Sequence, residues 1–400
     1  MIGSRRGVTA AFLTLTLPLW GATTVSASVP ASAASSPEGS DRSLSIPRPT
    51  GRYAVGRDIL HLVDKERRDP WVATAGGREL MVSMYYPAVN GGSPAPYMTT
   101  DEAGLLLKGL KLDTAFKAEQ LTGVRVNARA GAPPVGGRHP LVVLSPGFSL
   151  NRATLTMLAE ELASKGYVVA LVDHAYESFG TTFPGGRTLT CIACDTIEEA
   201  PSDEAERKLL GEAADGRGAD ISFVVDELTR TAGHPSGWKH RKMIDPKRIG
   251  AAGHSLGGNA AADAMAADPR VRAGVNLDGT FFSQVPQSGL GRRPFLMLGT
   301  KAHHSPDSVD RSWLPAWKRL NGWKRWLTVA DSGHFTFIDL PVLGGQAGVI
   351  DPSAPLSGKR SGEITTAYVG AFFDQHLRGK RQPLLDGPST ANPEVAFHRP

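Results

Sequence analysis

The second half of the chain alternates short apolar runs with longer amphipathic stretches. Each apolar run is predicted to be a buried β-strand. These runs are residues 139–147, 168–174, 248–255, 272–278, 293–300 and 325–331. Helices are expected at residues 152–167, 204–231 and 362–380, with a further small-residue helix from Gly257. Apolar strands that alternate with helices indicate an α/β fold with a mostly parallel central sheet covered by helices on both faces.

The region before this regular pattern is more irregular. Residues 78–88 alternate apolar and polar positions and predict a strand, and residues 101–121 form a helical patch. A second irregular stretch, residues 174–202, is rich in glycine and proline and shows no period. A loop of that length in a compact domain is usually functional or mobile.

The first 34 residues have the pattern of a secretory signal peptide. Arg5 and Arg6 precede a short apolar stretch that ends in small residues. Pro18 and the shortness of this stretch argue against a membrane-spanning helix. We therefore expect a secreted, extracellular protein exported by the Sec or the twin-arginine route. The expected order is a signal peptide at 1–34, a Ser/Pro-rich linker at 35–49 and a single domain at 50–400.

The charge of the chain gives little indication of a nucleic-acid partner. The formal net charge is +5, and Arg5 and Arg6 of the signal account for two of these charges. The one tight basic run, Lys239 to Lys242, is explained by a solvated loop. A nucleic-acid interface needs clustered Lys and Arg over a wider surface, so we expect none.

The two cysteines, Cys191 and Cys194, lie in the irregular stretch. In an exported chain they are expected to form a local disulfide, because a structural zinc site needs about four ligands and no second cysteine pair exists. A thioredoxin-type redox role is the alternative, although the flanking pattern of such a motif is absent.

The segment Gly253-His254-Ser255-Leu256-Gly257 fits the motif G-x-S-x-G between a predicted strand and a predicted helix. In this setting the serine sits on a tight turn at the carboxyl end of the strand, with its hydroxyl above the sheet. Ser255 is therefore the candidate nucleophile. The alternative is a serine that caps the helix in an ordinary loop.

A serine hydroxyl needs a base, and an acid that orients this base. His334 is the candidate base because it lies in a polar turn just after the last predicted parallel strand. His303 and His304 follow the preceding strand and are its rivals, whereas His254 is expected to support the serine turn.

The candidate acid is Asp278, at the end of the strand that follows the serine. Asp307 and Asp310, after the next strand, are rival candidates. The order Ser, Asp, His along the chain is the order found in α/β-hydrolases.

Two backbone amides would bind the oxyanion. One is expected from Leu256, the residue after the serine, and the other from Phe148 in the loop after the first parallel strand. The candidate walls of an apolar acyl pocket are Phe148, Phe281, Phe282 and Phe335.

Six segments together resemble the platelet-activating-factor acetylhydrolase-like branch of the α/β-hydrolases, in a secreted bacterial form. They begin at Pro49, Arg78, Leu141, Gly253, Val275 and Asp331. The resemblance runs from about Thr50 to about Leu377 and implies Ser255 as nucleophile, Asp278 as acid and His334 as base. This chain departs from the better-known members in the sequence Ser145-Pro146 before the oxyanion-loop glycine and in Gly279 after the acid.

The expected function is hydrolysis of carboxylic esters with short to medium acyl chains, by a serine esterase without a metal or organic cofactor. The expected partner is a small-molecule or lipid ester, with transient contact with a lipid surface left open, as is the oligomeric state. Two different functions fit the same sequence less well: a lipase or polyester hydrolase acting on extended substrates, and a non-catalytic binding protein on a hydrolase scaffold.

Overall fold

The computed structural model describes residues 43–230 and 237–400. The predicted signal peptide and the first part of the predicted linker lie outside the described residues. Leu44 and Ile46 are buried in the core, so the last residues of the predicted linker pack against the body of the protein. Within the described ranges, no helix has the length and apolar character needed to cross a membrane.

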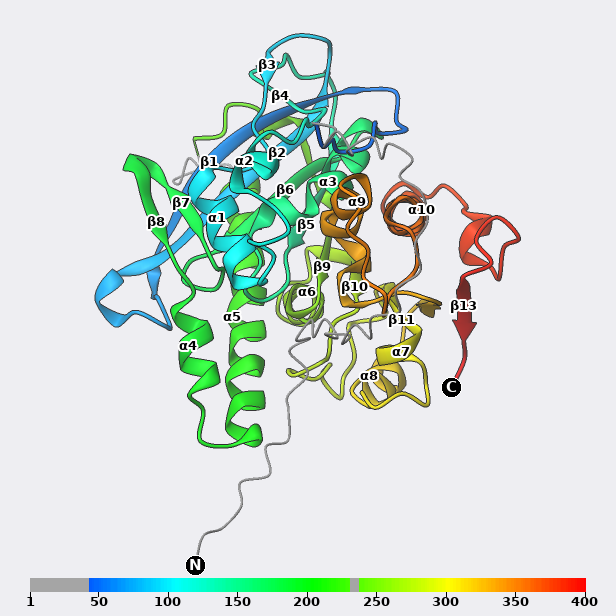
Figure 1. The fold of residues 1–400 in the computed structure, drawn as a ribbon. Helices are drawn as coiled ribbons and strands as arrows, with labels where there is room; N and C mark the ends of the chain where they lie inside the picture. The colour runs from blue at the N-terminus through cyan, green and yellow to red at the C-terminus, as the bar shows by residue number, and fades with distance from the viewer. Residues whose placement is uncertain (1–42, 231–236) are drawn as a thin grey trace, which may run out of the picture.

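An 11-stranded sheet forms the centre of the fold, in the order β13-β12-β11-β10-β9-β5-β6-β2-β1-β4-β3 (Figure 1). The six strands from β12 to β6 pair in parallel. Strands β13 and β2 pair antiparallel at the two sides of this parallel block, and β1 pairs antiparallel with β2. The strands are β1 (Ala54–Arg68), β2 (Gly77–Ala88), β3 (Ser93–Pro94), β4 (Arg129–Ala130), β5 (His139–Ser145), β6 (Val168–His174), β9 (Ile244–His254), β10 (Val271–Leu277), β11 (Phe295–Thr300), β12 (Lys324–Val329) and β13 (Val395–His398).

Helices cover both faces of the sheet, as the sequence predicts (Figure 1). The α-helices are α1 (Thr100–Gly109), α2 (Ala118–Thr122), α3 (Thr156–Ser164), α4 (Ile192–Glu198), α5 (Asp203–Thr229), α6 (Leu256–Ala267), α7 (Lys301–His304), α8 (Trp313–Arg319), α9 (Asp339–Gln346) and α10 (Gly358–Arg378). Successive residues of β5 point to opposite faces of the sheet and pack into two different apolar cores. Leu144 packs in the core formed with α3, α9 and α10, whereas Val143 packs in the core formed with α5, α6 and α8. The α/β fold expected from the sequence is confirmed.

The six apolar runs correspond to β5, β6, β9, β10, β11 and β12. The long strand β1 and the C-terminal strand β13 were not predicted as strands. Buried and exposed positions alternate along only part of β1, so its sequence lacks the regular period of a strand. The helical patch at 101–121 is divided into α1 and α2.

The stretch 174–202 is not a structureless loop, which corrects the expectation from its glycine and proline content. It contains the hairpin of β7 (Thr181–Phe183) and β8 (Arg187–Leu189), followed by α4. These strands have three residues each, too few to show a period in the sequence. A disulfide joins Cys191, which caps the start of α4, to Cys194 in its first turn.

The order in which the parallel strands are added reverses at β5 and β9. Strand β5 is followed along the chain by β6 on one side, while β9 pairs with its other side. The loop after β5 and the turn after β9 therefore leave the same edge of the sheet side by side, with Ser145 opposite Gly253. Such a switch point is where α/β folds usually place a site.

Candidate active site

Ser255 occupies the turn between β9 and α6. Its backbone angles, φ 54° and ψ −124°, are strained for a residue with a side chain. Its N–H donates to the carbonyl oxygen of Leu277, 2.8 Å away, which ties the turn to the end of β10. A Cβ atom on Gly257 would lie 2.1 Å from the carbonyl oxygen of Ser145, so α6 approaches β5 this closely only with glycine there. The geometry is that of a nucleophile elbow.

His334 begins the short 3-10 helix η5 (His334–Phe337) after β12, and Asp278 directly follows β10. The Nδ1 atom of His334 lies 2.7 Å from the Oδ2 atom of Asp278. Asp278 is buried and has a φ of 54°. A Cβ atom on Gly279 would lie 2.1 Å from the carbonyl oxygen of Ser255, so this glycine lets the turn of Asp278 approach the turn of Ser255 closely.

His254 links the turn of Ser255 to His334, the candidate base. Its Nε2 atom lies 2.7 Å from the carbonyl oxygen of His334, and the two imidazole rings are 4.6 Å apart. Burial, with the neighbouring His334, lowers the pKa of His254 to about 3. The neutral ring therefore donates its Nε2–H to this carbonyl and holds the His334 turn against the residue before Ser255.

His304, one of the rival bases, has a different place in the site. It is buried, with Nδ1 2.7 Å from Oδ1 of Asp278 and Nε2 3.1 Å from Oδ2 of Asp310. Carboxylates only accept, so both ring nitrogens donate and the ring carries a positive charge. Trp313 stacks on the ring at 4.2 Å. Both nitrogens of His304 are thus engaged, which leaves neither for the proton of Ser255.

His303 and Asp310 are held less closely to the Asp278–His334 pair. His303 is half-buried, with Nδ1 3.7 Å from Oδ2 of Asp278. Asp310 pairs with His304 and accepts from Thr280, and among the described residues no hydrogen bond or ion pair joins it to His334. The sequence did not indicate that one aspartate holds two histidines, because their separation along the chain carries no periodic signal.

The charge on His304 predicts a pH-dependent stability. Burial alone lowers the pKa of His304, but Asp278 and Asp310 outweigh it and raise the pKa to about 9 from an ordinary 6.5. A raised folded-state pKa gives stability that is fully present below pH 6.5 and is lost as the pH rises through about 9. We expect the free energy of unfolding, measured by urea titration from pH 6 to 10, to fall by about 3 kcal/mol from this group.

The variant His304→Gln should be less stable at neutral pH and should lack this fall. The matched control is His376→Gln, because burial lowers the pKa of His376 to about 4, outside the window. An unchanged pH dependence in His304→Gln would contradict a charged His304.

Asp278, His303 and His334 are the group of described residues that could offer atoms to a metal ion, all within 4.8 Å of one another. An ion bound there would take the Nδ1 atom of His334 from its bond with Asp278, or use the opposite nitrogen. The Nδ1 atom of His334 is already hydrogen-bonded to Asp278, whereas His303 lies 3.7 Å from the same carboxylate oxygen. The expectation of no metal or organic cofactor stays a prediction.

Leu256 belongs to a small buried apolar cluster, and Phe148 packs against the same cluster. Leu256 is the first residue of α6, and Phe148 follows the end of β5. The cluster also contains Ile197, Leu210, Ala213 and Ala214, with Trp71, Leu209 and Phe282 at its partly exposed side. This places the two expected oxyanion donors on the neighbouring turns of the switch point.

The predicted pocket walls separate into two groups. Phe148, Phe282 and Phe335 are partly buried, and the ring of Phe335 lies 6.4 Å from that of His254. Phe281 is wholly buried against Phe295 in the core under α6 and cannot line a pocket. Its prediction as a wall was wrong because adjacent phenylalanines look equivalent in sequence, while only one of two neighbours points outward here.

Comparison with protein families decides the identification. The model of the family described as platelet-activating factor acetylhydrolase, isoform II, matches residues 38–186 and 236–368. The chain belongs to this family. The match includes Phe148, Ser255, Asp278 and His334.

Relatives of this acetylhydrolase-family chain are esterases. A protein of Arthroderma benhamiae, named probable 1-alkyl-2-acetylglycerophosphocholine esterase, is 29% identical over 88% of this chain and 93% of its own length. The platelet-activating factor acetylhydrolase of Cavia porcellus is 22% identical over 83% of this chain and 78% of its own length. The structure of a ferulic acid esterase from Streptomyces cinnamoneus is 42% identical, with a TM-score of 0.77 over 89% of this chain and 100% of its own. The acetylhydrolase-family chain is thus a carboxylic ester hydrolase.

Proposed function

We propose that this chain hydrolyses esters of short to medium acyl groups with a Ser255–His334–Asp278 triad. In this mechanism Ser255 attacks the ester carbonyl, and His334 takes the hydroxyl proton and then gives it to the leaving alcohol. Asp278 holds His334 in the required tautomer. The backbone N–H groups of Phe148 and Leu256 bind the oxyanion, and water then releases the acid from the acyl-enzyme.

The observation that carries the proposal is the 2.7 Å contact between Nδ1 of His334 and Asp278, beside the strained elbow of Ser255. Because Nδ1 carries the proton toward Asp278, Nε2 is free of a proton and can act as the base. Both expected oxyanion residues follow strands β5 and β9, which are paired. Burial alone raises the pKa of Asp278, but His304 and hydrogen bonds from histidines outweigh it and keep the pKa well below its ordinary value.

Export is also part of the proposal. The apolar N-terminal stretch after Arg5 and Arg6 supports it, and so does the Cys191–Cys194 disulfide, since disulfides persist in oxidising compartments.

A second candidate is an ester with an aromatic acyl group. The 42% identical structure is that of a ferulic acid esterase, and a protein of Streptomyces coelicolor named bis(hydroxyethyl) terephthalate hydrolase is 27% identical over 35% of this chain. Trp71, Phe148 and Phe282, partly buried around Leu256, could stack on an aromatic ring.

Hydrolysis of p-nitrophenyl esters from acetate to palmitate, with methyl ferulate in parallel, tests the proposal. We expect kcat/KM to be highest at acetate to butyrate. A higher value for methyl ferulate would favour the second candidate, and an optimum at palmitate would favour a lipase. Absence of turnover on every ester would contradict the proposed function.

A further inference from the structure

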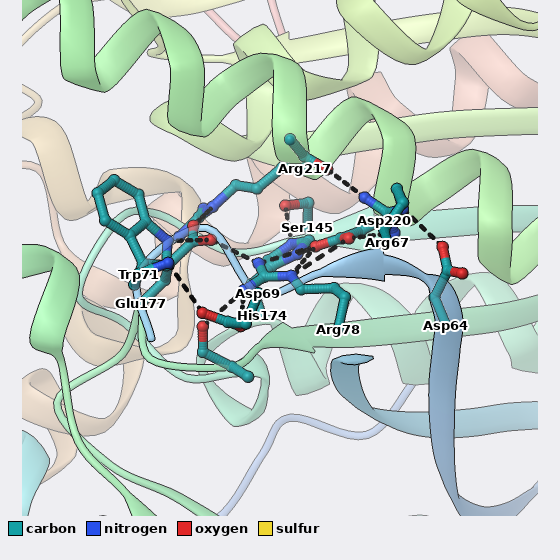
Figure 2. A network of polar contacts seen from close by, with 12 residues as sticks. Asp64, Arg67, Asp69, Trp71, Arg78, Ser145, His174, Glu177, Arg217 and Asp220 are labelled. Atoms are coloured by element: carbon teal, nitrogen blue, oxygen red, sulfur yellow. Dashed lines mark hydrogen bonds and ion pairs between the residues drawn. The ribbon is translucent and has the colours of Figure 1, made fainter. Parts of the chain in front are cut away.

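A largely buried network of charged side chains lies beside the end of β5, where Ser145 is located (Figure 2). It joins β1 and β2 to the loop after β6 and to the middle of α5. Its arginines and carboxylates are Arg67, Arg78, Arg217, Asp64, Asp69, Glu177 and Asp220. Burying so many charges is unfavourable unless each is paired, and replacement by apolar residues would often stabilise a fold equally well. Stability alone therefore does not explain why these charged side chains are buried here, and a role in the site is the alternative explanation.

Arg217 connects this network to the loop between β5 and α3. Its Nη1 atom donates to the carbonyl oxygen of Pro146 at 2.7 Å. Its guanidinium also lies over the ring of Phe148, 5.8 Å from the centroid. Arg217 thus contacts Pro146 and Phe148, the residues on both sides of Gly147. The N–H of Phe148 belongs to the Gly147–Phe148 peptide group, which lies between these two contacts.

Glu177 holds the other side of the same loop. Its carbonyl oxygen accepts from the N–H of Ser149 at 2.9 Å, while its Oε2 atom accepts from Nε of Arg217 at 2.6 Å. The N–H of Phe148 therefore lies between two fixed points, the carbonyl of Pro146 and the N–H of Ser149. The guanidinium of Arg217 holds the first point and the backbone carbonyl of Glu177 holds the second, and the side chains of these two residues are paired with each other.

The pair itself is held rigidly. Glu177 Oε1 accepts from Arg78 and, at 3.0 Å, from Nε1 of Trp71, as Figure 2 shows. Both Glu177 and Arg217 are at most 2% exposed. Burial alone raises the pKa of Glu177, but Arg217 and Arg78 outweigh it and lower the pKa, so the carboxylate stays charged.

The end of β5 is anchored by a second Ser-His-Asp chain. The Oγ atom of Ser145 lies 2.9 Å from Nε2 of His174, and Nδ1 of His174 lies 2.7 Å from Oδ2 of Asp220. All three side chains are buried, so no ester can reach Ser145. Burial, with Arg217, lowers the pKa of His174, and the neutral ring accepts from Ser145 while it donates to Asp220. This chain is structural, and it fixes the residue immediately before Pro146.

We propose that Arg217, clamped by Glu177, is a positioning residue that aims the N–H of Phe148 at the oxyanion. This inference rests on the proposed function. Arg217 does not touch the substrate in this role. It acts through the carbonyl of Pro146 and the ring of Phe148, and a small displacement of an oxyanion donor is enough to slow catalysis.

The test compares Arg217→Met with Arg67→Met. Arg67 belongs to the same network, with Nη2 2.7 Å from Oδ1 of Asp220, but its hydrogen bonds and ion pairs do not reach the loop. For p-nitrophenyl acetate we expect Arg217→Met to lower kcat about 10- to 100-fold, with KM changed less than about threefold. The affinity for a trifluoromethyl ketone, which forms an oxyanion on Ser255, should fall by the same factor as kcat/KM. Arg67→Met should keep the wild-type kcat.

The double variant Arg217→Met/Glu177→Gln removes both charges of the pair together, so that no buried carboxylate is left with Arg78 as its one cationic partner. We expect it to fold and to keep the low kcat of Arg217→Met. A kcat within about twofold of wild type in either folded variant, or an equal loss in Arg67→Met, would overturn the positioning role. A wild-type protein that hydrolyses no ester would instead overturn the proposed function, which separates the two failures.

Discussion

Replacement of Ser255 by alanine is expected to lower kcat for p-nitrophenyl acetate on the order of 10⁵- to 10⁶-fold. The Oγ atom of Ser255 is the nucleophile of the proposed mechanism. In the alanine variant no other group on the turn can attack the ester carbonyl in its place. Alanine carries the same strained backbone as serine at a φ of 54°, so the free energy of unfolding should stay within about 1 kcal/mol of wild type. Stopped-flow and steady-state kinetics, with urea unfolding in parallel, measure both quantities.

The control is Ser305→Ala, since the hydroxyl of Ser305 donates to the carbonyl oxygen of Lys301 and, among the described residues, makes no hydrogen bond to Ser255, His334 or Asp278. It should keep wild-type kinetics. A fluorophosphonate label located by mass spectrometry gives an independent answer, because Ser145 also sits in a Ser-His-Asp chain. A label on Ser145, or turnover that survives in Ser255→Ala, would show that the nucleophile is assigned wrongly.

Asp278→Asn is expected to lower kcat about 10⁴-fold with little change of KM. An asparagine at this position would present N–H donors to the N–H of His334 or His304, which favours the wrong tautomer of the base. Asp278 also accepts from the N–H of Thr300 at 2.6 Å, so the variant loses several charge-assisted hydrogen bonds at once. Steady-state kinetics near neutral pH measure the loss of kcat.

Asp307→Asn and Asp310→Asn are the matched comparisons, because both residues follow β11 and were rival candidates for the acid. Asp307→Asn should stay within about twofold of wild type. Asp310→Asn removes one of the two partners of His304 and should lower kcat by about tenfold or less. A larger loss in either variant than in Asp278→Asn would assign the acid to that residue.

The sequence predicted the parallel strands and the nucleophile turn because their signals are local. A strand buried on both faces, such as Val168–His174, is apolar at nearly every position, and the motif around Ser255 spans five residues. The acid and base could be chosen because each follows a predicted strand at the correct edge of the sheet. Local patterns of this kind survive without knowledge of tertiary contacts.

The charge network could not be predicted by the same means. Arg78 and Asp220 are 142 positions apart, and Arg217 lies between two glycines of a helix where a charged residue usually indicates a solvated face. A buried ion pair has the sequence signature of two surface residues, since burial is decided only when distant segments pack. His304 was predicted as a rival base for the same reason: its bond to Asp310 depends on the fold of the turn after β11.

Ser255 and Asp278 both adopt a φ of 54°, at the ends of the adjacent strands β9 and β10. Such backbone conformations are of order 1 kcal/mol or more unfavourable for residues other than glycine. Both strand ends carry a polar side chain on a backbone that favours glycine, so local backbone energy is given up at the two turns where the proposed chemistry takes place.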